Sequence, residues 1–182
     1  MNLAVLKQAS AQVLVLPDAR PLITLAYADA LDLLFKPGWS VAIVDMVQHE
    51  VTRNETPTSS KIGQWILDNG LPIIETTIYA SYRQRCVELG RAARSSNLGE
   101  LAIQEAMHRF ATDLSFKQGV FVFEDHKIAK ASFVLPENCL KVSTRSLLLL
   151  LEQKRWISSA LEVARQAIVA GRSFSRLRFP PA

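Results

Sequence analysis

Short apolar runs alternate with stretches of helical periodicity along nearly the whole chain. Strands are expected at residues 12–16, 41–44, 72–75, 119–123 and 140–142. Helices are expected between and after them, at residues 21–34, 46–53, 58–69, 80–94, 97–113, 128–131, 147–151 and 158–171. Continuous apolar strands separated by helices are typical of a parallel sheet covered on both faces. The pattern predicts an α/β fold, a three-layer α/β/α sandwich with a central, mainly parallel sheet of about five strands.

The size and composition of the chain fit one folded domain. Its 182 residues leave little room for a second domain, and it shows no internal repeat or interdomain linker. Apolar residues make up 49% of the chain and charged residues 21%, which excludes disordered and collagen-like classes. We expect one domain over residues 1–157, with residues 158–182 forming a C-terminal helix and a basic tail that pack on this domain or extend from it.

Cysteine usage and apolar run lengths indicate where the protein works. Cys86 and Cys139 have no CxxC spacing, so a reducing cytosol is the natural setting. The run Leu147–Leu151 is far shorter than the roughly 20 residues that span a bilayer. Residues Met1–Lys7 lack the basic start and long apolar stretch of a signal peptide. We therefore expect a cytoplasmic protein with no membrane contact.

Charge is distributed unevenly along the chain. The formal net charge is +4, but residues 1–140 carry 13 basic and 15 acidic side chains, whereas residues 141–182 carry 8 basic and 2 acidic ones. A basic end on a nearly neutral body suits a polyanion or an acidic protein as partner.

Acidic side chains follow the expected strands, at the edge where parallel sheets bind ligands. Asp18 comes two residues after the first strand, Glu50 lies six residues past the second, and Glu124 and Asp125 directly follow Phe123. Glu100 lies in the first turn of a helix. Taken singly, Asp18 is also a plausible N-cap, Glu100 a partner of the helix dipole, and Glu50 a solvated helix residue. Together, carboxylates in one cleft stay ionised only beside cations, and hard oxygen ligands suit Mg²⁺ or Mn²⁺.

Five segments resemble the PIN-domain family of metal-dependent ribonucleases, over about residues 13–157. They are Asp18–Leu25 after the first strand, Val44–Val51 with a glutamate on the following helix, Leu98–Ile103 with its Gly-Glu pair, Phe121–Ala129 with an acidic turn, and Val142–Thr144 before a leucine-rich helix. The last step is similar to that of prokaryotic members close to the toxins of toxin–antitoxin pairs.

The resemblance implies a PIN-like nuclease with one or two Mg²⁺ or Mn²⁺ ions. Asp18, Glu100 and Asp125 would hold the metal and Glu50 would complete the catalytic cluster; of the adjacent pair, Glu124 remains open as the alternative to Asp125. A metal-bound water would cleave an RNA phosphodiester, leaving a 5′-phosphate and a 3′-hydroxyl. The partners implied are an RNA substrate and a small antitoxin that covers the acidic cleft.

Further residues are candidates for substrate contact. Thr144 at a helix start could bind a phosphate or orient Asp18, and Arg83 and Arg85 could contact backbone phosphates. The leucine run is apolar around the whole helix, so it is either buried or shared with a second copy in a homodimer. Arg20 departs from the family pattern, which has a small or hydroxylated residue there, and it could neutralise part of the acid cluster.

Two other function classes compete with the ribonuclease. One is a catalytically weak or inactive PIN-like module that binds RNA or regulates through its basic surface. The departures at Arg20, and at Leu101 and Ile103 in the third segment, leave this alternative open. The other is a receiver-like domain, which needs an acceptor aspartate at the end of the third strand. The residues there are Glu75-Thr76-Thr77, so this class ranks lowest.

Overall fold

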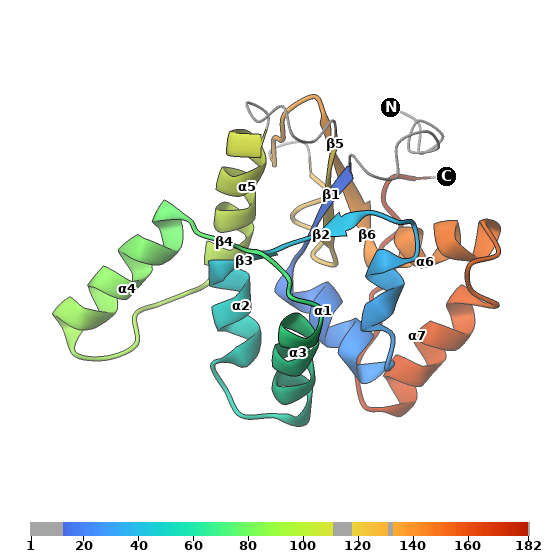
Figure 1. Cartoon of the computed structure of the whole chain (residues 1–182), viewed down its shortest axis with the longest axis horizontal. Helices are drawn as coiled ribbons and strands as arrows, with labels where there is room; N and C mark the ends of the chain where they lie inside the picture. Colours follow the sequence, from blue (N-terminus) through green and yellow to red (C-terminus); the bar gives the residue numbers. More distant parts are fainter. Residues whose placement is uncertain (1–12, 111–117, 131–132, 182) are drawn as a thin grey trace.

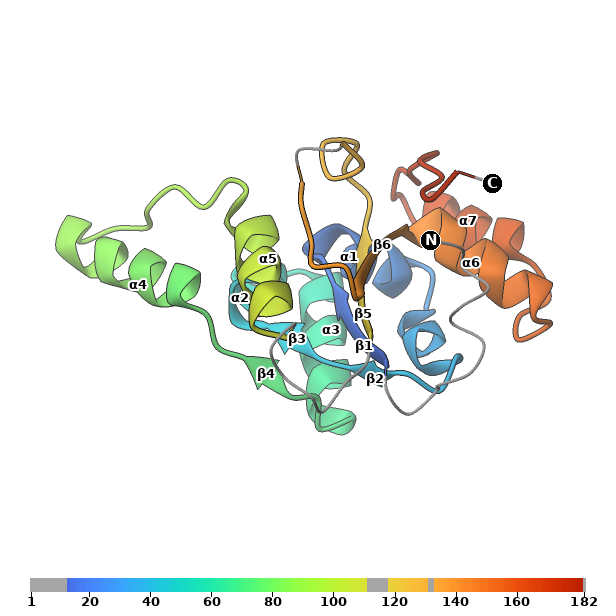
Figure 2. The same ribbon diagram turned by 90° about the horizontal axis from the view of Figure 1, so that it is seen from above.

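A parallel sheet with helices on both faces forms the body of the protein (Figures 1 and 2). The computed structural model describes residues 13–110, 118–130 and 133–181. The sheet has the order β2-β1-β5-β6, made of Ser40–Val41, Val13–Pro17, Gln118–Phe123 and Cys139–Ser143. Two further strands, β3 (Ile43–Val44) and β4 (Ile73–Ile74), pair in parallel with each other. The α/β three-layer sandwich expected from the sequence is confirmed.

The strand expected at residues 41–44 is divided between two partners. The backbone N–H of Ala42 donates to the carbonyl of Val15 in β1, at 3.1 Å, so β2 stays on the main sheet. One residue later, the N–H of Ile43 donates to the carbonyl of Pro72 at 3.0 Å, which carries β3 to β4. The five expected strand segments are therefore all present, and the second one bends from the main sheet to the smaller pair.

Strand order reverses at β1, and this places two acidic segments side by side. From β1 the chain crosses to β2 on one side, and β5 pairs with the other side of β1 with Pro17 opposite Val122. The N–H of Asp18 then donates to the carbonyl of Val122 at 2.9 Å. Such a switch point, at the carboxyl ends of the strands, is where open α/β sheets bind ligands.

The described residues form seven α-helices. They are α1 (Ala19–Tyr27), α2 (Asp45–Thr52), α3 (Pro57–Asp68), α4 (Thr77–Leu89), α5 (Leu98–Phe110), α6 (Thr144–Gln153) and α7 (Ala160–Val169). None of them is long and apolar enough to cross a membrane.

Three helix predictions were wrong in part. The helix expected over residues 80–94 ends at Leu89, because Gly90 ends it with a left-handed φ of 60°. The helix expected over residues 21–34 ends at Tyr27 and is followed by a 3₁₀ helix at Leu31–Phe35, because Asp29 between them has a left-handed φ of 53°. Residues 126–129, where a short helix was expected to begin, form turns instead. The expected ends of this segment at Ala131 and of α5 near Asp113 lie outside the described residues.

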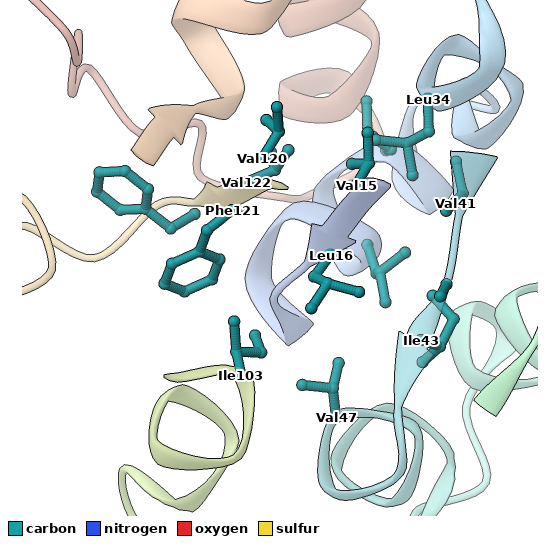
Figure 3. Close-up of a cluster of buried hydrophobic side chains, with 14 of the residues drawn as sticks. Val15, Leu16, Leu34, Val41, Ile43, Val47, Ile103, Val120, Phe121 and Val122 are labelled. Carbon is teal, nitrogen blue, oxygen red and sulfur yellow. The ribbon is translucent and has the colours of Figure 1, made fainter. Parts of the chain in front are cut away.

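The core lies between the central strands and the helices on either face (Figure 3). All five residues of β1 are buried, and so are the last five of β5. Phe121 and Phe123 are fully buried with ring centroids 5.8 Å apart. Ile103 of α5 and Val47 of α2 close the core beneath Leu16. Burial on both faces explains why the strands read as continuous apolar runs.

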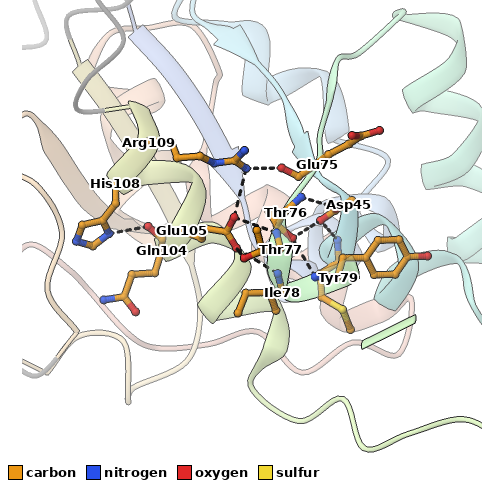
Figure 4. A network of polar contacts seen from close by, with 11 residues as sticks. Asp45, Glu75, Thr76, Thr77, Ile78, Tyr79, Gln104, Glu105, His108 and Arg109 are labelled. Atoms are coloured by element: carbon orange, nitrogen blue, oxygen red, sulfur yellow. Dashed lines mark hydrogen bonds and ion pairs between the residues drawn. The ribbon is translucent and has the colours of Figure 1, made fainter. Parts of the chain in front are cut away.

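Helix α4 projects from the body as an arm (Figures 1 and 2). Its base is fixed by two carboxylates (Figure 4). Asp45 accepts hydrogen bonds from the N–H and the hydroxyl of Thr76, both at 2.7 Å. Glu105 of α5 accepts from the N–H and the hydroxyl of Thr77, both at 2.9 Å. These two acids therefore have a structural role, holding the start of α4 against α2 and α5.

The C-terminal residues pack on the domain. The leucines that make α6 apolar around its circumference are mostly buried within this chain: Leu147, Leu148 and Leu151 lie in the core. After α7, the chain returns to β6, where the N–H of Ser143 donates to the carbonyl of Phe179 at 2.8 Å. The Phe179 ring then meets Phe123 edge-on at 5.7 Å.

Candidate functional site

Asp18 is a buried carboxylate at the switch point of the sheet. It follows β1 at the N-cap position of α1, but its side chain makes no capping hydrogen bond and is only 4% exposed as a residue. Burial is the main reason that its pKa rises from 3.8 to about 7, and the charges of Glu100 and Glu50 raise it further. The N–H of Ala19 and the charge of Arg20 act in the opposite direction.

Glu50 reaches the same region from α2. Burial raises its pKa from 4.5 to about 7, and the charge of Glu100 adds to this shift. Arg53 and the N–H of Gly99 oppose it. Gly99 is buried in the first turn of α5, and its missing side chain leaves the space that the Glu50 carboxylate occupies.

Glu100 connects these carboxylates electrostatically. It lies next to Gly99 at the start of α5, and its charge raises the pKa of both Asp18 and Glu50. Three of the four acids expected at the site therefore interact electrostatically: Asp18 after β1, Glu50 on α2 and Glu100 on α5.

Asp125, in the turn after β5, forms an ion pair with Arg20. Its Oδ2 lies 3.5 Å from Nη2 of Arg20, a residue in the first turn of α1. Its Oδ1 accepts a hydrogen bond from the N–H of Lys127 at 2.9 Å. The arginine at position 20 therefore neutralises part of the charge of Asp125, the fourth acid expected at the site.

Glu124 turns away from Asp125 into a buried polar group. Its Oε2 accepts a hydrogen bond from the hydroxyl of Thr24 at 3.0 Å and lies 3.9 Å from Nη2 of Arg172. Nε of Arg172 donates to the same Thr24 hydroxyl at 3.1 Å. Burial raises the pKa of Glu124, while the hydroxyls of Thr144 and Thr24 and the charges of Arg172 and Arg20 lower it.

The remaining predicted residues lie in two different settings. Thr144 begins α6 and is 1% exposed. Its hydroxyl acts on the buried Glu124 carboxylate and lowers the pKa of that group, so it does not lie at the surface where a phosphate would bind. Ser143 caps the helix by accepting from the N–H of Ser146 at 3.2 Å. Arg83 and Arg85 are exposed along the α4 arm.

The acids fit Mg²⁺ or Mn²⁺ in their donor chemistry. Three carboxylates offer hard oxygen ligands, and burial together with the charge of Glu100 raises the pKa of both Asp18 and Glu50. As placed, no three His, Cys, Asp or Glu side chains among the described residues are grouped closely enough to hold an ion. Binding would therefore require these side chains to draw together around the cation.

Sequence reasoning missed the contact of Arg172 with Thr24 and Glu124. These residues are up to 148 positions apart, and only the general basicity of the C-terminal end pointed to an anionic partner. No family model, curated protein or solved structure matches the chain. The chemistry of the acidic site therefore has to be inferred from its own geometry.

Proposed function

We propose that this protein is a PIN-like, Mg²⁺- or Mn²⁺-dependent endoribonuclease. The observation that carries the proposal is the convergence of Asp18, Glu50 and Glu100, from three separate elements, at the switch point of a parallel sheet. Buried carboxylates that repel one another destabilise a fold unless a cation joins them. Perturbed acids of this kind, placed at a ligand-binding edge, are typical of functional sites.

Each residue has a defined part in this proposal. Asp18, Glu100 and Asp125 would hold the ion, and Glu50 would position the cluster from α2. A bound divalent ion supplies a water of lowered pKa and stabilises charge on a phosphate. Release of Asp125 from Arg20 would complete the ligand set and free a guanidinium for the substrate phosphate.

RNA is the proposed substrate, and the basic α4 arm supports it. Arg83 and Arg85 lie exposed on a helix that projects from the body beside α2 and α5, which carry Glu50 and Glu100. Arginines in this position bind backbone phosphates without reading sequence. Cleavage would leave a 5′-phosphate and a 3′-hydroxyl. In the same proposal, a small antitoxin covers the acids, the protein acts in the cytoplasm, and a homodimer is its assembled form.

The Arg20–Asp125 ion pair supports a second candidate, a non-catalytic RNA-binding module of the same fold. An arginine that already neutralises the fourth acid lowers the need for a metal there. The basic surfaces would then carry the function alone.

Cleavage of RNA during a metal titration tests the proposal. Wild-type protein is expected to cleave single-stranded RNA with Mg²⁺ or Mn²⁺ and to stop in EDTA, whereas Asp18→Asn loses cleavage by at least about 100-fold. Glu55→Gln removes the same charge at an exposed position after α2 and serves as the control. RNA binding without metal-dependent cleavage in the wild type would favour the binding module instead.

A further inference from the structure

The C-terminal segment, residues 172–179, runs across the carboxyl ends of β5 and β6. At one end, Arg172 contacts the Thr24 hydroxyl of α1 and the Glu124 carboxylate after β5. At the other end, the N–H of Phe179 donates to the hydroxyl of Ser143 at 3.0 Å, and the Ser143 N–H bonds back to Phe179. The segment therefore spans the sheet edge at which the proposed catalytic acids lie.

This segment also contacts the backbone that carries Asp125. The hydroxyl of Ser175 donates to the carbonyl of Glu124 at 3.3 Å, and that carbonyl belongs to the peptide bond between Glu124 and Asp125. Ser175 also accepts from the N–H of Leu177 at 3.2 Å, which fixes its own position. Both the side chain and the carbonyl of Glu124 are thus held by residues from the C-terminal end.

Glu124 is buried among a small set of groups that favour its charged form: the Thr144 and Thr24 hydroxyls and the charges of Arg172 and Arg20 all lower its pKa. It is 5% exposed, and its Oε1 makes no hydrogen bond within the described residues. A buried carboxylate deprived of its remaining partners is costly, so the acidic turn would rearrange without Arg172. Thr24 connects the same group to α1, the helix that begins directly after Asp18. The group therefore connects the residue before Asp125 to the helix that begins after Asp18.

We propose that Arg172 and Ser175 are positioning residues of the acidic site, which act through Glu124 to hold Asp125 in place in the turn after β5. The C-terminal segment, residues 172–179, then helps to position the residues of the site. The structural half of this inference is that Arg172 and Ser175 fix the turn at Asp125, and it does not depend on the proposed function. Its consequence for metal binding rests on the proposed function.

The structural half is tested by amide hydrogen exchange in the full-length chain. The Lys127 N–H donates to Asp125 Oδ1 and so reports on the geometry of the turn. We expect Arg172→Ala and Ser175→Ala each to speed exchange of this amide about 10-fold, with the amides of β5 unchanged. Arg176→Ala, an exposed arginine of the same segment, is the matched control and is expected to leave it unchanged.

The functional half is tested by Mn²⁺ affinity, measured well below the unfolding temperature of each variant. Removal of a residue that orients a ligand weakens metal binding about 10- to 100-fold. We expect about 10-fold for Arg172→Ala, less for Ser175→Ala and Arg172→Lys, and no change for Arg176→Ala. Should Arg172→Ala prove unstable, Ser175→Ala carries the test, because it removes one hydroxyl from a partly buried site.

Three results separate the two proposals. Faster Lys127 exchange with weaker Mn²⁺ binding supports both. If the Lys127 amide exchanges faster in the variants but the wild type binds no Mn²⁺, the ribonuclease proposal is overturned. The positioning of the turn by Arg172 and Ser175 is then still supported. The inference is overturned if Arg172→Ala and Ser175→Ala both match the Arg176→Ala control in Lys127 exchange and in Mn²⁺ affinity.

Discussion

Oε2 of Glu50 lies 2.8 Å from the point that a Cβ on Gly99 would occupy. The carboxylate thus sits over the first turn of α5, where an N–H is available and where Glu100 follows directly. Any side chain at residue 99 would displace the end of Glu50, which is flexible, while the helix itself could remain. Gly99 is therefore a position where the site can be changed without breaking the fold.

Gly99→Ala is expected to lower RNA cleavage about 10-fold while leaving the free energy of unfolding equal or higher. Alanine is favoured over glycine in a helix by about 1 kcal/mol, but its methyl group would push the Glu50 carboxylate out of the acidic site. Steady-state cleavage and denaturant unfolding measure the two effects. Gly63→Ala in α3 is the control, since its Cβ would meet only Thr52 Cγ2 at an ordinary 3.9 Å. Full activity in Gly99→Ala would contradict this role for Glu50.

Stability in EDTA is expected to fall as pH rises. Burial and the charge of Glu100 raise the pKa of Asp18 from 3.8 to about 7, so the folded state binds the proton more tightly than the unfolded state. The free energy of unfolding therefore declines between about pH 4 and pH 7, by on the order of 4 kcal/mol for Asp18. Denaturant unfolding at successive pH values measures it.

Asp18→Asn is the control for this pH dependence. The variant carries no charge at this position, so the part of the decline due to Asp18 should disappear, while the part due to Glu50 should remain. Saturating Mn²⁺ should also reduce the decline in the wild type, because a cation favours the ionised carboxylates. A wild-type protein whose stability is flat or rises over this range would contradict the buried, repelling arrangement of the acids.

Arg20→Ala is expected to bind Mn²⁺ about 10-fold more tightly than the wild type. The guanidinium lies 3.5 Å from Asp125 Oδ2 and would compete with a metal for this oxygen. Its removal frees the carboxylate and takes away one positive charge. Calorimetric titration measures the affinity, and Lys36→Ala, which removes an exposed charge elsewhere, is the control. Weaker binding in Arg20→Ala would mean that the arginine supports the metal site.

Replacement of both Arg83 and Arg85 by alanine is expected to weaken RNA binding and reduce its dependence on salt. Removing each arginine that binds a phosphate should lower the slope of log affinity against log salt concentration by about one. Binding is measured in EDTA, so that cleavage does not interfere. Arg165→Ala on α7, an exposed arginine paired with Glu162, should bind RNA like the wild type. An unchanged salt slope in the double variant would exclude the arm from the RNA interface.

The layers of the fold could be predicted because each central strand is buried on both faces. Val13–Pro17 and residues 119–123 are apolar for that reason, and they are visible in the sequence as continuous apolar runs. The break after Tyr27 could not be predicted, because it depends on a left-handed Asp29, a conformation that asparagine and aspartate adopt without a clear local signal.

Part of the candidate site could likewise be predicted from the sequence, and part could not. Asp18, Glu50 and Glu100 follow predicted strands or begin a predicted helix, so the topology of a parallel sheet was enough to bring them together. The different directions of Glu124 and Asp125 depend on Arg172 and Arg20, which are contacts between side chains. Such contacts are decided by packing of the C-terminal segment, and no periodicity in the chain reports on them.

Calorimetric titration of the metal-free protein with Mn²⁺ decides whether the convergent acids form a cation site. The wild type is predicted to show saturable binding of one or two ions, weakened at least about 100-fold in Asp18→Asn and unchanged in Glu55→Gln. Absence of saturable binding, or equal binding by wild type and Asp18→Asn, would contradict the assignment of Asp18, Glu50 and Glu100 to a metal-dependent active site.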